Sequence, residues 1–253
     1  MATTCAPSTL ITSVQRALHL LRAAARTPGG APAKQLAQAV GLPIGTTYHL
    51  LRTLTVEGYL QRLPNGCYVV GDEVASLLDQ SRLQTLLQRC RPALTALRDV
   101  TGAPAYLAFY ENREIVVKDI QDSPTAPRID IWVGFREAGH ATAFGKCVLA
   151  FLDPEERHDY LARHPLHALT ARTITNRQVL LESLERIRTA GLAIEDEEYL
   201  PAIACIAAPI LVNGLTGAVA LSIPRRRLAD LDELVPPLMQ TAERIERWST
   251  LTL

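Results

Sequence analysis

The segment Gly41-Leu-Pro-Ile-Gly-Thr-Thr-Tyr-His-Leu-Leu-Arg-Thr-Leu54 carries the clearest structural signal in the first part of the chain. Pro43 is suited to the opening of a helix, and apolar-face residues then recur at helical spacing. These residues are Thr47, Leu50, Leu51 and Leu54. A shorter helix that opens near Pro32 ends at Gly41, a residue type that commonly stops helices. Two helices joined by so tight a turn predict a helix-turn-helix.

The sequence on either side completes this motif. A first helix is expected to begin at Ser13 and to end at Pro28-Gly29-Gly30. Two short strand-like runs, residues 59–63 and 67–70, are separated by the turn Pro64-Asn65-Gly66. This hairpin is expected to form the wing of a winged helix-turn-helix that spans residues 10–72.

The face of the third helix opposite its apolar stripe is expected to contact DNA. Hydroxyl, imidazole and guanidinium groups can form hydrogen bonds to phosphates or to base edges in the major groove. A basic residue of the wing can contact the neighbouring DNA backbone. The expected DNA-binding residues are Arg16, Lys34, Thr46, Thr47, Tyr48, His49, Arg52 and Arg62. The alternative is a helical bundle whose polar residues merely face solvent.

Charge is unevenly distributed, although the formal net charge of the whole chain is zero. Residues 1–70 carry six basic side chains and a single acidic one, Glu57, and the remainder carries an equal negative excess. A basic module joined to an acidic one suits a protein that approaches phosphates with only one end. Chance clustering in a sequence rich in alanine and arginine is the alternative.

Residues 73–91 are expected to form a linker helix between the first domain and a second domain over residues 92–253. Apolar residues recur along the linker at helical spacing. Pro92 is expected to end this helix and to open another, because proline is tolerated best in a first turn. The apolar face of the linker suits either the seam of a dimer or packing against its own domain.

The second domain mixes strands and helices, which predicts an α+β fold with an antiparallel sheet flanked by helices. The expected strands are Ala103–Tyr110, Ile115–Ile120, Ile129–Val133, Leu192–Glu195, Ile203–Val212 and Ala218–Ile223. The expected helices are Ala141–Leu152, Pro154–Arg163, Asn176–Ala190 and Asp230–Thr250. The start of the first of these helices could attract a carboxylate, since its backbone amides are unpaired and its dipole end is positive. The predicted ligand is therefore a small organic acid.

One uncharged segment, between Glu198 and Arg225, is long enough to span a bilayer. Pro201, Pro209 and Asn213-Gly214 break it into short strands, so no membrane partner is expected. Residues 1–12 lack the pattern of a signal peptide. A cytoplasmic protein with reduced thiols is expected.

Several motifs, in this order along the chain, resemble those of the IclR family of bacterial transcriptional regulators. They are Ser13-Val-Gln-Arg-Ala-Leu, the stretch from Gly41 to Leu54, Gly66-Cys-Tyr-Val-Val-Gly71, His140-Ala-Thr-Ala-Phe-Gly-Lys-Cys-Val-Leu-Ala150, Thr173-Ile-Thr, Gly191-Leu-Ala-Ile-Glu-Asp-Glu-Glu198 and Cys205-Ile-Ala-Ala-Pro209. The resemblance implies a GAF-like effector-binding domain and a homodimer or homotetramer that binds a partly palindromic double-stranded operator. Two positions depart from the family pattern: His49 stands where arginine is common, and Ala202 where glycine is usual.

The resemblance also implies an effector pocket, lined by Ala143, Phe144, Glu195, Cys205 and Ser222. Phe144 could stack on an aromatic ligand. Glu195 would repel an acid unless it bonds to a ligand hydroxyl. Phe144 and Cys205 could equally be core residues.

Two other functions remain as alternatives. One is a hydrolase-like enzyme that uses Cys205 or Cys147 as nucleophile and His140 as base, although the apolar run around Cys205 disfavours a thiolate. The other is a sensing or dimerisation module that has lost DNA contact. The scattered cysteines form no Cys-x-x-Cys pair, so no structural zinc site is expected. No other metal and no cofactor are expected, and no catalytic residue is assigned.

Overall fold

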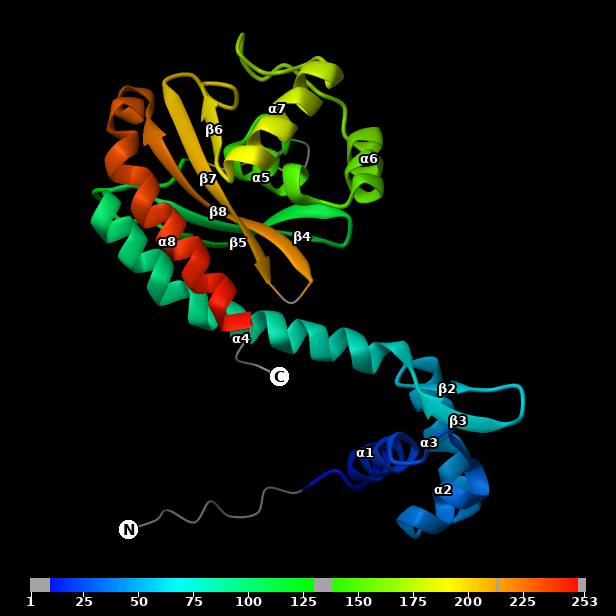
Figure 1. The fold of residues 1–253 in the computed structure, drawn as a ribbon. Helices are drawn as coiled ribbons and strands as arrows, with labels where there is room; N and C mark the ends of the chain where they lie inside the picture. The colour runs from blue at the N-terminus through cyan, green and yellow to red at the C-terminus, as the bar shows by residue number, and fades with distance from the viewer. Residues whose placement is uncertain (1–9, 130–137, 213, 250–253) are drawn as a thin grey trace, which may run out of the picture. The chain divides into compact units, whose positions relative to one another are not determined.

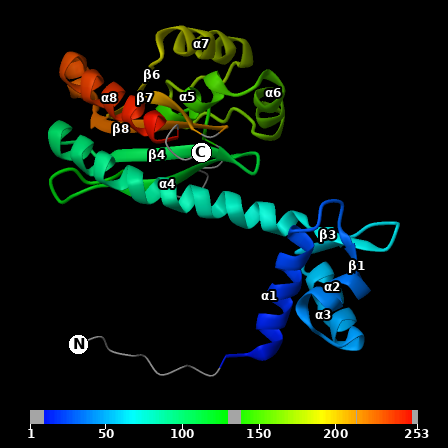
Figure 2. The same ribbon diagram turned by 60° about the horizontal axis from the view of Figure 1, so that its bottom comes forward.

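The computed structural model describes residues 10–129, 138–212 and 214–249. The chain divides into two compact units, Met1–Gln84 and Thr85–Leu253. Figures 1 and 2 show the elements of each unit from two directions.

The described residues of the N-terminal unit up to Val70 form three helices and a small antiparallel sheet. The helices are α1 (Thr12–Ala25), α2 (Ala33–Val40) and α3 (Ile44–Val56). The strands are β1 (Ala31–Pro32), β2 (Leu60–Arg62) and β3 (Cys67–Val70), in the order β1-β3-β2. The hairpin of β2 and β3 is visible in Figure 1. The predicted winged helix-turn-helix is confirmed.

The turn between α2 and α3 depends on Gly41. Its φ of 66° is left-handed, and the N–H of Leu42 then donates to the carbonyl of Ala37 at 3.0 Å. Such a closure is favoured at glycine, which has no Cβ to clash. The turn lets both helices pack on one core, which contains Leu20, Leu36, Leu51, Leu54, Leu60 and Tyr68.

The helix α4 (Asp72–Thr101) is continuous, and Pro92 lies inside it. The expectation that the linker ends near Cys90 and a second helix opens at Pro92 is therefore wrong. Pro92 is exposed, so its ring clashes with no neighbouring element. The residues on both sides of it are buried, namely Leu86, Cys90, Ala93, Leu94 and Leu97. Their burial offsets the backbone hydrogen bond that proline cannot make.

The apolar residues of α4 divide along its length. Most of those from Leu86 onwards are buried within the C-terminal unit, which agrees with the expectation that the linker packs against its own domain, although Val100 is 74% exposed. Leu77 and Leu78 instead remain 44% and 51% exposed. The first turns of α4 therefore keep an uncovered apolar surface in this single chain.

In the described part of the C-terminal unit, the strands form a five-stranded antiparallel sheet in the order β5-β4-β8-β7-β6. The strands are β4 (Ala105–Glu111), β5 (Glu114–Gln121), β6 (Ala193–Asp196), β7 (Ile203–Val212) and β8 (Leu215–Pro224). The helices are α5 (Ala143–Phe151), α6 (Pro154–Arg163), α7 (Arg177–Ala190) and α8 (Leu231–Ser249), with the 3-10 turn η2 (Arg225–Asp230) before α8. The expected α+β, GAF-like arrangement is confirmed. The expected strand at Ile129–Val133 lies outside the described residues after Ile129, which is itself irregular.

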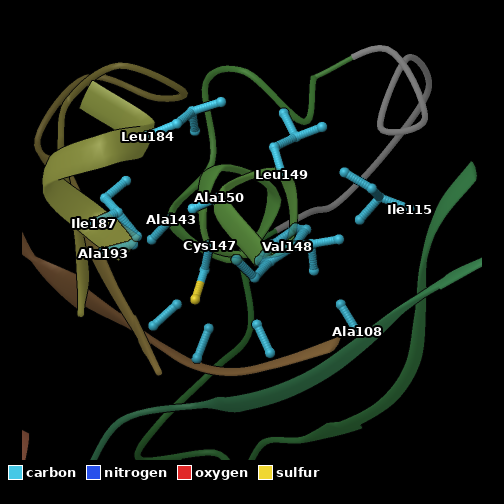
Figure 3. Close-up of a cluster of buried hydrophobic side chains, with 14 of the residues drawn as sticks. Ala108, Ile115, Ala143, Cys147, Val148, Leu149, Ala150, Leu184, Ile187 and Ala193 are labelled. Atoms are coloured by element: carbon cyan, nitrogen blue, oxygen red, sulfur yellow. The ribbon is translucent and has the colours of Figure 1, made fainter. Parts of the chain in front are cut away.

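Helices cover both faces of this sheet (Figure 1), which explains the uninterrupted apolar runs in β7 and β8. Cys205 and Ala207 face the cluster that contains α5, whereas Ile206 and Ala208 belong to the opposite face and are also fully buried. Figure 3 shows the α5 side of the core, where Cys147 and Val148 of α5 lie among Leu184 and Ile187 of α7 and Ala108 of β4. This packing fixes the start of α5 above the middle of the sheet.

Candidate functional site

The exposed face of α3 is the candidate nucleic-acid surface of the N-terminal unit. His49 and Arg52 are exposed, Tyr48 is 54% exposed, and Thr46 is half-buried. The opposite stripe of α3, with Leu51 and Leu54, is buried in the core. Because α3 contains no acidic residue, this face offers only neutral and basic groups to a partner.

Thr47 does not belong to this face. Its side chain is fully buried, and its hydroxyl donates to the carbonyl of Pro43 at 3.1 Å. The expectation that Thr47 binds DNA is corrected, because Thr47 shares the helical stripe of Leu51 and Leu54 that packs inward. The sequence spacing already placed Thr47 on this apolar stripe, which is inconsistent with its assignment as a DNA-binding residue.

The other expected DNA-binding residues lie around the same unit. Arg16 of α1, Lys34 of α2 and Arg62 of β2 are all exposed. The guanidinium of Arg62 lies 6.0 Å from the centre of the Tyr68 ring, a cation-π contact that orients it on the wing. The structure thus leaves seven of the eight expected side chains accessible or partly accessible.

A pocket at the start of α5 is the candidate ligand site of the C-terminal unit. It is a small pocket that is partly open to solvent. It is lined by Tyr106, Ile129, Thr142, Phe144, Tyr199, Cys205, Ala220, Leu221 and Ser222. Three of the expected effector residues, Phe144, Cys205 and Ser222, are therefore brought together. Cys205 and Ser222 are direct partners in the register of β7 and β8.

Sequence reasoning missed the hydroxyl-bearing residues of this pocket, Tyr106, Thr142 and Tyr199. Thr142 caps α5, where its side chain accepts from the N–H of Gly145 at 3.1 Å. A threonine just before a helical run is a recognised capping signal and could have identified it. Nothing in the local sequence distinguishes Tyr106 or Tyr199, which reach the pocket through tertiary packing.

Ala143 and Glu195, also expected in the pocket, are fully buried beside it rather than in its lining. Ala143 belongs to the core cluster around α5. Glu195 pairs with Cys205 in the register of β6 and β7. Its carboxylate accepts hydrogen bonds from the backbone N–H groups of Glu198 and Tyr199, the latter at 3.0 Å. Glu195 thus holds the turn that carries Tyr199 to the pocket.

Burial governs the charge of Glu195. Desolvation raises its pKa to about 7, although the two backbone N–H donors and the ammonium of Lys146 act to lower it. Lys146, on α5, is only 1% exposed and donates to Glu198 at 2.5 Å. Sequence reasoning did not single out this buried ion pair, which lies beside the pocket rather than in its lining.

The thiols do not support a nucleophilic site. Burial raises the pKa of both Cys147 and Cys205 well above the ordinary value, which disfavours the reactive thiolate. The Nε2 atom of His140 lies 2.9 Å from the backbone carbonyl oxygen of His167. Among the described residues, no group of three metal-ligating side chains comes together. No helix in the described ranges has both the length and the apolarity needed to cross a membrane.

A winged helix-turn-helix with a basic exposed face, in one chain with a pocket-bearing GAF-like domain, defines a DNA-binding transcriptional regulator. Two family models match the chain: the IclR helix-turn-helix domain over residues 13–64, and the bacterial transcriptional regulator IclR C-terminal domain over residues 80–247. The chain belongs to the IclR family.

Individual relatives agree with this assignment. The transcriptional repressor IclR of Escherichia coli strain K12 is 31% identical over 233 residues, which cover 89% of this chain and 85% of the relative. The crystal structure of IclR from Thermotoga maritima is 26% identical and has a TM-score of 0.57, covering 93% of this chain and 98% of that one. An IclR homologue from Microbacterium hydrocarbonoxydans, complexed with 4-hydroxybenzoate, shares the fold at 22% identity with a TM-score of 0.59, covering 93% and 98% of the two chains.

Proposed function

We propose that a small organic acid, bound in the pocket at the start of α5, modulates the binding of this regulator to a double-stranded operator. The pocket is the observation that carries the proposal. Its lining combines apolar side chains, among them Phe144 and Ile129, with the hydroxyl-bearing residues Tyr106, Thr142 and Ser222. Among the residues that the structure describes, no carboxylate lines it. An anion there would meet hydroxyl donors and the positive end of the α5 dipole.

A hydroxyl on the acid would find a further partner. Oε2 of Glu195 is buried and has no hydrogen-bond partner within the described ranges. A buried carboxyl oxygen without a partner is costly, and a ligand hydroxyl that reached it would remove that cost. The IclR homologue complexed with 4-hydroxybenzoate provides the probe, because that compound carries both groups on an aromatic ring.

Thermal unfolding of the full chain with 4-hydroxybenzoate, benzoate and benzamide tests the ligand class. Binding to the folded state raises the melting temperature. We expect the largest rise with 4-hydroxybenzoate, a smaller one with benzoate and none with the neutral benzamide. The rise should shrink in Ser222→Ala and Phe144→Ala and persist in Ser76→Ala, a change on exposed α4.

The regulatory half of the proposal needs a separate measurement. In a gel shift with an operator duplex, the protein concentration that binds half of the duplex should change when the stabilising acid is added. If no acid in the panel shifts the melting temperature, the ligand class is wrong. If an acid binds but leaves this protein concentration unchanged, the regulatory role is wrong.

We further propose that Arg16, Lys34, Thr46, Tyr48, His49, Arg52 and Arg62 contact the operator, and that a homodimer or homotetramer binds its two half-sites. The contact with the operator is supported by the exposed or partly exposed position of these side chains on the basic N-terminal unit. Uncovered apolar side chains support the oligomer: Val14 and Leu18 of α1 and Leu77 and Leu78 of α4 are all more than two-fifths exposed. Light scattering of the wild type and of Leu77→Glu/Leu78→Glu should show a loss of mass in the variant. An unchanged mass would exclude this surface.

A further inference from the structure

Nearly every glycine in the described part of the chain has a structural reason to lack a side chain. One group has positive φ, a conformation that other residues rarely adopt: Gly29, Gly30, Gly41, Gly58, Gly66, Gly102, Gly191 and Gly214. In the other group an added Cβ would lie 2.1–2.6 Å from another atom: Gly71, Gly139, Gly145 and Gly217. Substitution is therefore strained or blocked at each of these positions.

Gly45 is the exception among the described glycines. It lies in the first turn of α3, its φ is not positive, and it is exposed. A Cβ built on it meets nothing within 4 Å. Glycine is less favourable than alanine in a helix, because it loses more backbone freedom on folding. The folded chain thus gives no reason for this glycine and is less stable with it.

The place of Gly45 on α3 suggests where the reason lies. Gly45 is four residues before His49 and seven before Arg52, so the three share one helical face. That face is opposite the buried stripe of Leu51 and Leu54. In a helix-turn-helix, the N-terminal residues of the recognition helix are the ones that approach the base edges. Gly45 is therefore a gap in the side-chain surface at the point that reaches deepest into the DNA.

We propose that the backbone of α3 lies directly against the operator at Gly45, and that the missing side chain sets how deeply α3 enters the groove. This inference rests on the proposed contact between α3 and DNA. The small residue acts by positioning: it allows His49 and Arg52 to come within bonding distance of bases or phosphates. Any side chain at position 45 would hold the helix away and lengthen those contacts.

The test measures stability and affinity in one variant. In full-length Gly45→Ala, we expect the melting temperature to rise, because alanine favours the helix and meets no obstacle. Affinity for a duplex that the wild type selects from a random-sequence pool should fall by about tenfold or more, as base contacts are lost. Gly45→Leu should lose more affinity than Gly45→Ala. The matched control is Val100→Leu, near the end of α4 in the C-terminal unit and 74% exposed, which should leave affinity within about twofold.

Three results would overturn the proposal. If Gly45→Ala melts higher but binds as tightly as the wild type, the backbone at Gly45 does not touch DNA. If Gly45→Ala melts lower, the glycine serves folding instead. If the wild type selects no duplex at all, the contact of α3 with DNA fails, and the inference fails with it.

Discussion

Arg52 projects into solvent from a helix that carries no acidic side chain. A guanidinium in this position can pair with phosphate or with guanine, and such a contact is worth about 1–3 kcal/mol. We expect Arg52→Ala to weaken operator binding by about tenfold or more. The melting-temperature rise with 4-hydroxybenzoate should stay at its wild-type size, because Arg52 belongs to the other unit.

Arg188→Ala is the control for this change. Arg188 is an exposed arginine of α7, paired with Glu185 on the same helix. Its loss should alter neither DNA binding nor the response to acids. If Arg52→Ala reduced both activities equally, the two units would not divide the labour as described.

Glu195 should make stability depend on pH. In the folded chain it keeps its proton up to a pH of about 7, whereas its ordinary pKa is 4.5. As the pH rises through this window, the unfolded chain releases the proton first, so the free energy of unfolding falls. The fall is at most ~1.4 kcal/mol per pH unit and ends once the pH exceeds the folded-state pKa.

Urea unfolding at several pH values, in the wild type and in Glu195→Gln, isolates this contribution. The difference between the two proteins in the free energy of unfolding should change between pH 4.5 and about 7 and become constant above this range. A difference that stays constant throughout would show that Glu195 is ionised in the folded chain at all these pH values.

At the residue level, sequence reasoning succeeded where a helical stripe or a motif placed the side chain. The exposed face of α3 follows from the spacing of Leu51 and Leu54, and Phe144 and Cys205 follow from motifs. Sequence reasoning missed Tyr106 of strand β4 and Tyr199 of the turn after β6, because only the packed sheet brings these segments together. The Lys146–Glu198 pair was missed for the same reason, since its partners lie 52 residues apart in the sequence.

At the level of elements, helix α4 shows how tertiary packing overrides a local signal. Proline inside a helix costs about 3 kcal/mol, which justified the expected break at Pro92. The sequence alone does not reveal that residues on both sides of Pro92 are buried within the same unit. The other elements matched more closely, because caps such as Asn176 and stops such as Gly191 act locally.

Pro92→Ala should therefore stabilise the chain. The change restores a backbone N–H to α4 and removes no core contact, since Pro92 is exposed. We expect the free energy of unfolding in urea to rise by about 1–3 kcal/mol. Pro154→Ala is the matched control, because Pro154 occupies the first turn of α6, where proline is tolerated. If Pro92→Ala had the same free energy of unfolding as the wild type, α4 would already accommodate the proline without cost.

At the level of the whole molecule, the two units differ in charge and in the candidate site that each carries. The excess of basic residues lies in the first seventy residues, while the pocket belongs to the C-terminal unit. Residue composition, helix spacing and motif order together predicted the fold class and the family. They could not predict the volume and lining of the pocket, which depend on how helix α5 rests on the sheet.

The basic face of α3 is expected to bind DNA through phosphates and bases. Fluorescence anisotropy of the full chain with its selected duplex, across a range of salt concentrations, tests it most directly. The logarithm of the association constant should fall linearly with the logarithm of the salt concentration. If the Arg52 guanidinium binds phosphate or a neighbouring base, this slope should be shallower in Arg52→Ala by the equivalent of about one phosphate contact. An affinity that is independent of salt, or an Arg52→Ala variant identical to the wild type in both slope and affinity, would contradict the account.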